Sequence, residues 1–193
     1  MRKILLFLSI LLFSAQFTTV SAQTQFDVDG VIVPRTIPFE GKTLQLNGFG
    51  TRSKMFLEVY VQALYLSQLS QDAPDILERD SQMAIRIQIT SSMVSSSKLT
   101  RNFNKGFELS SPENIEELRS RMEMLKGFLS DKIVEGDVFN LIYNPTDTSV
   151  WVYKNDILKG RIPGIDFKKA LFGIWLSDRP VDEKLKNDLL GKF

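Results

Sequence analysis

The clearest pattern in the sequence is a strict alternation of side-chain types over residues 55–66. Alternate residues of a strand point to opposite faces, so a period of two predicts a β-strand here. One face is wholly apolar and is predicted to lie in the core; it carries Met55, Leu57, Val59, Val61, Ala63 and Tyr65. The other face is mixed and carries Phe56, Glu58, Tyr60, Gln62, Leu64 and Leu66. The mixed face meets either solvent or a partly polar cavity, and one wet face is the commoner arrangement in antiparallel sheets.

Further strand and turn patterns lie on both sides of this segment. Residues 83–90 alternate in the same way and predict a second one-sided strand. Residues 138–143 and 148–153 predict a β-hairpin, because the tetrapeptide between them is rich in turn-forming residues. Residues 48–50, Gly-Phe-Gly, are predicted to form a turn that leads into the alternating segment. A polar loop is predicted between the two alternating strands, around Asp72, Pro74 and Asp75.

Apolar residues that recur every three or four positions predict four helices in the rest of the chain. A serine cluster caps the first, within residues 98–107, and Ser111 begins the second. Asp166 is predicted to cap the third, and the fourth spans residues 182–190 before Gly191. Strands and helices come in separate runs instead of strict alternation. This order is typical of an α+β domain with helices packed on an antiparallel sheet.

The first 22 residues differ from the rest and are predicted to be a secretory signal peptide, residues 1–22. Arg2 and Lys3 precede an apolar run that is too short, and too often interrupted by Ser, Thr and Gln, to span a bilayer. Residues 20–22, Val-Ser-Ala, match the small-x-small pattern of a cleavage site. We therefore expect one domain over residues 23–193, exported to the periplasm or released, without an integral membrane segment in the mature chain.

Composition removes several functional classes. The chain of 193 residues contains no Cys and no His, which excludes disulfides, thiol chemistry, Ser-His triads and His or Cys metal sites. Loss of Arg2 and Lys3 with the leader changes 24 basic and 23 acidic residues to 22 and 23. A nearly neutral chain without a basic stripe gives no support for nucleic-acid binding. We expect neither a metal site nor a cofactor.

Arg52 is the first candidate functional residue, because it follows Gly48 and Gly50 and enters an otherwise β-rich segment. A charged side chain in such a position needs an anion or an exit to solvent. The anion belongs either to a ligand or to the protein itself, for example Glu58 or an acid on a helix.

Three motifs in order resemble the chalcone isomerase-like family, in its bacterial exported branch. They are GFGTR at residues 48–52, VYVQALYL at 59–66, and GRIPGIDF at 160–167 followed by IWL at 174–176 and Pro180. The resemblance implies an open-faced β-sandwich, in which helices cover one face of a large antiparallel sheet. It also implies a ligand cleft between the sheet and the helices.

The same resemblance implies candidate site residues. Plant chalcone isomerases close a flavanone ring, whereas relatives without that activity bind fatty acids. The arginine of the family motif corresponds to Arg52, and the tyrosine that helps the fatty-acid binders hold a carboxylate corresponds to Tyr60. The mixed strand face with Glu58 and Gln62 then becomes a candidate cleft wall. The isomerases also use a Tyr and an Asn from the helical layer, and the corresponding stretch, residues 114–125, has no tyrosine.

These residues favour a non-catalytic binder of a small amphipathic carboxylic acid, with a fatty acid as the leading candidate. Arg52 would be the charge partner, because a guanidinium meets a carboxylate with two parallel hydrogen bonds. Tyr60 would donate a further hydrogen bond, and Gln62 and Glu58 complete the predicted ligand-binding set; no catalytic residue is assigned. Two alternatives stay open: an intramolecular lyase of the chalcone isomerase type, and an envelope structural or assembly partner whose cleft is filled by side chains.

Overall fold

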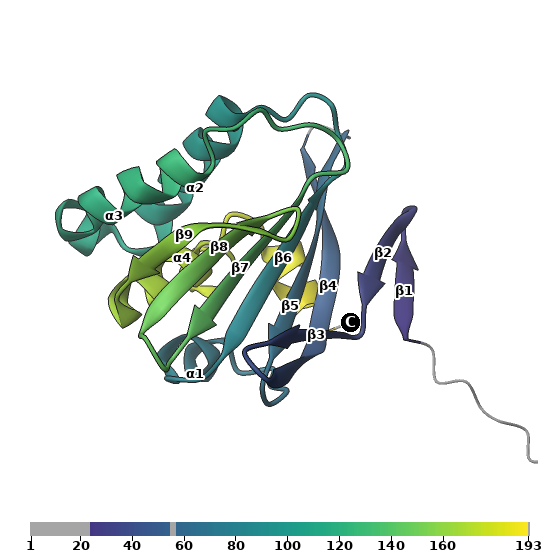
Figure 1. The fold of residues 1–193 in the computed structure, drawn as a ribbon, viewed down its shortest axis with the longest axis horizontal. Coiled ribbons are helices and arrows are strands. Elements are labelled where there is room, and N and C mark those ends of the chain that lie inside the picture. The colour runs from purple at the N-terminus through teal and green to yellow at the C-terminus, as the bar shows by residue number, and fades with distance from the viewer. Residues whose placement is uncertain (1–23, 55–56, 193) are drawn as a thin grey trace, which may run out of the picture.

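A seven-stranded antiparallel sheet forms the centre of the molecule, in a computed structural model that describes residues 24–54 and 57–192 (Figure 1). Its strands lie side by side in chain order, so each pairs with its neighbours in sequence. They are β3 (Thr36–Phe39), β4 (Lys42–Lys54), β5 (Leu57–Leu66), β6 (Met83–Ile89), β7 (Val138–Asn144), β8 (Ser149–Lys154) and β9 (Ile157–Pro163). The predicted β-hairpin is β7 and β8. The predicted leader, residues 1–22, lies outside the described residues.

Helices cover one face of this sheet and share a single apolar core with it. They are α1 (Ala73–Glu78), α2 (Ser96–Ser110), α3 (Ile115–Phe128), α4 (Ile165–Leu176) and α5 (Glu183–Leu189), with a short 3-10 turn, η1 (Pro112–Asn114), before α3. The predicted α+β class, with helices on one face of a large antiparallel sheet, is confirmed. None of the helices in the described ranges combines the length and apolar character needed to cross a bilayer.

The opposite face of the sheet is partly covered by a separate two-stranded sheet, β1 (Gln25–Val28) and β2 (Val31–Pro34). Val61, Ala63 and Tyr65 of β5 belong to this second, smaller core. The Tyr65 hydroxyl donates to the backbone oxygen of Pro34 at 2.8 Å, which satisfies its one polar atom. The expectation that this face of β5 is buried is therefore confirmed for Val61, Ala63 and Tyr65.

Most of the mixed face of β5 is also buried, so of the two alternatives left open for this face, solvent applies, among its described residues, only to Glu58 near its start. Tyr60 and Leu64 lie in the core beneath the helices, with 7% and 0% of their surface exposed, and Gln62 is fully buried. The reason lies in the layer order: the helices pack on this face, and the wholly apolar face packs on β1 and β2. When both faces of a strand are buried, its sequence pattern does not show which of them packs against the larger core.

Residues 48–50 lie within β4 and form no turn, contrary to the sequence prediction. The pairing of β4 with β5 shifts register between Leu46 and Gly48, as at a β-bulge. The glycines are needed because α5 crosses β4 here. A Cβ on Gly48 would lie 2.2 Å from the backbone oxygen of Asp188, and one on Gly50 would lie 2.6 Å from the Asp188 carboxylate. Their role is close approach, not chain reversal.

Two helix starts also differ from the prediction. The expected polar loop contains α1, whose N-cap Asp72 accepts from the backbone N–H of Asp75 at 3.1 Å. This helix is only six residues long, too short for a periodic apolar pattern to reveal it. In α4 the N-cap is Gly164, and Asp166 lies in the first turn. The predicted cap of α2 within the serine cluster is confirmed as Ser95, whereas Ser111 begins η1 without a side-chain cap hydrogen bond.

Candidate functional site

The pairing of β4 with β5 sets Arg52 directly opposite Tyr60. Residues paired across two strands point to the same face of the sheet, here the face covered by helices. The two principal residues of the predicted site are therefore neighbours on adjacent strands.

A cavity of about 250 Å³ opens beside these two residues. We call it the Arg52 cavity. Its walls come from β4, β5, β6, α2, α4 and the segment that leads into α5; they are Arg52, Val59, Tyr60, Ile87, Leu99, Asn102, Phe103, Lys105, Leu109, Ile174, Trp175, Pro180 and Val181. Most of this lining is apolar, with a few polar groups among it. Such a lining is typical of sites for small amphipathic molecules.

Tyr60 supplies a neutral hydroxyl at the wall of the Arg52 cavity. The indole N–H of Trp175 donates to the Tyr60 hydroxyl oxygen at 3.2 Å, and both side chains are buried. Burial raises the pKa of the Tyr60 hydroxyl above its usual value, against smaller lowering effects of the Trp175 hydrogen bond and the nearby Arg52 charge. The phenol therefore stays protonated at neutral pH. Its own hydrogen remains able to donate to a bound molecule.

Arg52 forms an ion pair with Asp182 through Nη1, which also donates to the backbone oxygen of Ser53 at 3.3 Å. The two side chains are 26% and 19% exposed, so the pair is partly shielded from water. Of the anions considered for Arg52, the structure shows a carboxylate of the protein, from the start of a helix and not from Glu58. The Nη2 and Nε donors of Arg52 have no partner among the described residues, so ligand contact stays a prediction for this guanidinium.

The other two predicted residues do not line the Arg52 cavity. Gln62 lies on the same face of β5, two residues beyond Tyr60, but is fully buried in the core. Neither its amide nitrogen nor its amide oxygen finds a hydrogen-bond partner among the described residues. Glu58 is exposed near the start of β5. The structure thus brings Arg52 and Tyr60 together at the cavity and leaves Gln62 beneath the surface and Glu58 outside.

Sequence reasoning missed the contribution of α2. Asn102 and Lys105 lie three residues apart on α2, hence on one side of the helix, and both line the cavity. The helical stretch expected to face the cleft, residues 114–125, falls in η1 and α3, and α3 packs against β9 instead. The only sign of this in the sequence is that the two polar residues are spaced to lie beside the apolar stripe of α2. Such a polar pair is common on any exposed helix, so it does not by itself indicate a site.

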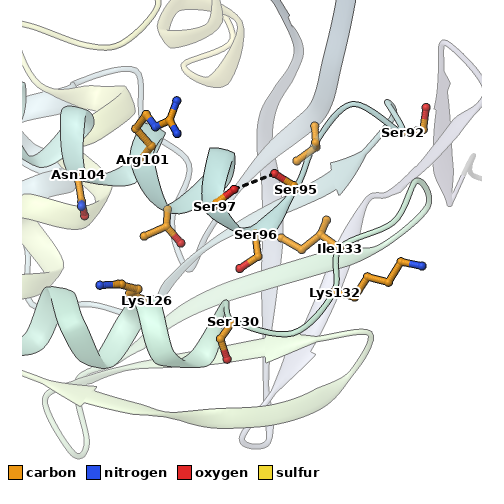
Figure 2. Close-up of a pocket in the computed structure, with 12 residues that line it drawn as sticks. Ser92, Ser95, Ser96, Ser97, Arg101, Asn104, Lys126, Ser130, Lys132 and Ile133 are labelled. Carbon is orange, nitrogen blue, oxygen red and sulfur yellow. Dashed lines mark hydrogen bonds between the residues drawn. The ribbon is translucent and has the colours of Figure 1, made fainter.

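A larger hollow of about 890 Å³ lies near the start of α2, and we call it the serine groove (Figure 2). It is lined by Ser92, Val94, Ser95, Ser96, Ser97, Thr100, Arg101, Asn104, Lys126, Ser130, Lys132 and Ile133. Several of its polar groups serve the local fold. Ser95 caps α2, Ser96 donates to the Leu129 oxygen, and Lys126 pairs with Glu123. We therefore place the candidate site at the smaller and more enclosed Arg52 cavity.

Comparisons with known proteins agree with the fold. The crystal structure of an Arabidopsis thaliana fatty-acid binding protein is similar to this chain, with a TM-score of 0.66 and 18% sequence identity. The similarity covers 86% of this chain and 95% of the plant chain. None of the curated protein sequences compared with the chain matches it. The family model described as chalcone isomerase-like matches residues 25–191, and the chain therefore belongs to the chalcone isomerase-like family.

Proposed function

We propose that this chain is an exported, non-catalytic binding protein for a small amphipathic carboxylic acid, with a fatty acid as the leading candidate. The observation that carries the proposal is the Arg52 cavity, in which largely apolar walls surround a guanidinium and a protonated phenol. Its walls would hold the hydrocarbon part, and Arg52 and Tyr60 would hold the carboxylate. An assembly partner would have side chains filling this space. The similar Arabidopsis structure is that of a fatty-acid binding protein, which supports the same class of ligand.

The volume of the cavity sets the expected length of the ligand. The Arg52 cavity measures about 250 Å³. Sites for drug-sized ligands are commonly about 300–1,000 Å³. We therefore expect a medium-chain acid such as decanoate to fit within the walls. A long-chain acid such as palmitate would leave part of its chain in water or force the helices apart.

The first test is native mass spectrometry of the purified mature chain, followed by lipid extraction under denaturing conditions. We expect a bound acid in the extract, and calorimetry should show that the emptied protein binds decanoate more tightly than palmitate. Protein that carries no acid and has no affinity for either would refute the proposal.

Two substitutions test the proposed contacts. Loss of a charged hydrogen-bonding partner costs about 1.5–3 kcal/mol, so Arg52→Ala should weaken decanoate binding about 10- to 150-fold. Tyr60→Phe removes one neutral donor, worth about 0.5–1.5 kcal/mol, and should weaken it by about 2- to 13-fold. Arg79→Ala is the matched control, because Arg79 also pairs with a carboxylate, that of Asp75, but does not line the cavity. Equal losses in Arg79→Ala and Arg52→Ala would place the effect in folding instead of binding.

Export forms a separate part of the proposal, because it depends on residues 1–22 alone. The full-length chain expressed in a bacterium should appear in the periplasm or the medium. Its intact mass should correspond to a start at Gln23. A cytoplasmic product that retains Met1 would refute this part and leave the binding proposal intact.

A further inference from the structure

One of the three guanidinium nitrogens that Arg52 could offer a ligand carboxylate, Nη1, already pairs with another carboxylate. Oδ2 of Asp182 accepts from Nη1 of Arg52. The segment that carries Asp182 also supplies Pro180 and Val181 to the cavity wall. Asp182 therefore lies at the polar edge of the Arg52 cavity, in contact with the residue proposed to hold the ligand.

Two carboxylates on one guanidinium repel each other. The side chain of Asp182 is 19% exposed, so water and salt screen it less than they would screen a surface acid. The Arg52 cavity has one other cation in its lining, Lys105 of α2, and the described residues offer this lysine no carboxylate partner. With Asp182 in place, the charge of Arg52 is neutralised, and an incoming acid gains less from it than from a free arginine.

We propose that Asp182 is an internal competitor for the ligand, and that an acid binds by exchanging with the Asp182 carboxylate at Arg52. This inference rests on the proposed function and specifies how the same site is regulated. Asp182 lowers the affinity for acids and does not affect neutral molecules of the same size. The site therefore releases an acid more readily than an isolated Arg–Tyr pair would.

The exchange has a second effect, because the same carboxylate begins α5. Oδ1 of Asp182 accepts from the backbone N–H of Leu185 at 3.0 Å. A side-chain cap contributes about 1 kcal/mol to a helix, a large share for one of seven residues. An Asp182 side chain that leaves Arg52 loses the contact that holds it in this capping position. Acid binding should therefore loosen the first turn of α5.

The test compares Asp182→Asn with the unaltered mature protein, using decanoate and decanol as probes of equal chain length. Asparagine keeps the size of the side chain and is an equally good N-cap, so α5 retains its start. We expect Asp182→Asn to bind decanoate about tenfold more tightly and decanol within twofold of the unaltered protein. Asp182→Ser, which also caps, should show the same selective gain. Asp166→Asn is the matched control, because Asp166 pairs with Arg121, which does not line the cavity; it should change neither affinity.

Hydrogen exchange supplies a readout that a purely structural role would not affect. In the unaltered protein, decanoate should speed exchange of the Leu185 amide, whereas decanol should not. Unchanged or weaker decanoate binding in both Asp182 variants, with binding by the unaltered protein retained, would overturn the inference and leave the proposed function standing. Absence of binding by every variant, to either probe, would overturn both.

Discussion

Lys168 offers the sharpest test of how the helical layer is held together. This lysine of α4 is fully buried, and its Nζ donates to three backbone oxygens at the end of α1: Ile76 at 3.0 Å, Leu77 at 2.6 Å and Arg79 at 2.9 Å. The last carbonyls of a helix have no partner within the helix. Lys168 therefore acts as the C-terminal cap of α1 from another part of the chain.

Substitution Lys168→Met keeps the length of the side chain and removes all three donors. A buried acceptor left without a donor costs about 1–3 kcal/mol. The hydrogen bond to the Ile76 oxygen is buried, whereas those to the Leu77 and Arg79 oxygens are partly buried. In the variant, water can hydrogen-bond to the Leu77 and Arg79 oxygens in place of the lysine. We therefore expect a loss of about 2–4 kcal/mol in the free energy of unfolding, measured by urea denaturation with tryptophan fluorescence.

The pH dependence of this difference has a definite sign. Burial, followed by the neighbouring charge of Lys169, lowers the pKa of Lys168 from 10.5 to about 8. Between about pH 8 and 10.5 the unfolded chain holds a proton that the folded chain has lost, so the lysine's contribution to stability rises with pH by at most about 1.4 kcal/mol per unit. Below about pH 8 both states are protonated and the contribution is flat. The advantage of the unaltered protein over Lys168→Met should therefore grow above pH 8.

Lys169→Met is the matched control, because Lys169 is the next residue and forms an ion pair with Glu78 at the surface. Exposed pairs contribute about 0–1 kcal/mol, so this variant should be nearly as stable as the unaltered protein. Equal stability of Lys168→Met and Lys169→Met would refute the capping role. An advantage that shrinks above pH 8 would refute the lowered pKa.

Three further substitutions probe the fold. Gly48→Ala should lower the free energy of unfolding by more than about 2 kcal/mol, because its Cβ would lie 2.2 and 2.5 Å from backbone oxygens of α5. An unchanged midpoint of urea denaturation would refute the close approach of α5 to β4. Gly127→Ala, in α3 with open space around it, should instead stabilise the protein by about 0.5–1 kcal/mol. Asp137→Asn should destabilise it at pH 7. Although burial raises the pKa of Asp137, hydrogen bonds from the Asn155 side chain, a backbone N–H and Lys154 outweigh it and lower that pKa. Asp137 therefore contributes to the free energy of unfolding at pH values above the usual pKa of Asp, and this contribution is lost as the pH falls through its folded pKa. The stabilities of Asp137→Asn and of the unaltered protein, measured against pH, should accordingly converge in acid.

Periodicity predicted the elements that are long enough to show it. The β7–β8 hairpin, the cap of α2 in the serine cluster, and the burial of Tyr65 all follow from local patterns that the tertiary structure does not oppose. The glycines at 48 and 50 are ambiguous in sequence, because a turn and a close approach by another element demand the same residue. Only the position of α5, more than 130 residues later in the chain, decides between them.

The candidate site could be predicted only in part, for a related reason. Arg52 and Tyr60 lie in neighbouring strands, so a motif and a hairpin suffice to bring them together. Asn102, Lys105 and Asp182 reach the site from helices whose docking depends on the packing of the whole core. Gln62 is a polar residue that is fully buried in the structure. No local sequence pattern distinguishes a buried glutamine from one that lines a cavity.

The position of α5 on β4 has a consequence for the order in which the molecule assembles. Neighbouring strands are joined in sequence, so most of the sheet can form from contacts between nearby segments. The Arg52–Asp182 pair and the hydrogen bond from Asn47 to the Leu189 oxygen instead close loops of 130 and 142 residues. Closing such loops is entropically costly and requires nearly the entire polypeptide. Ligand-binding competence should therefore arise in the last step of folding, and a chain cut before Asp182 should form its sheet and still lack a finished site.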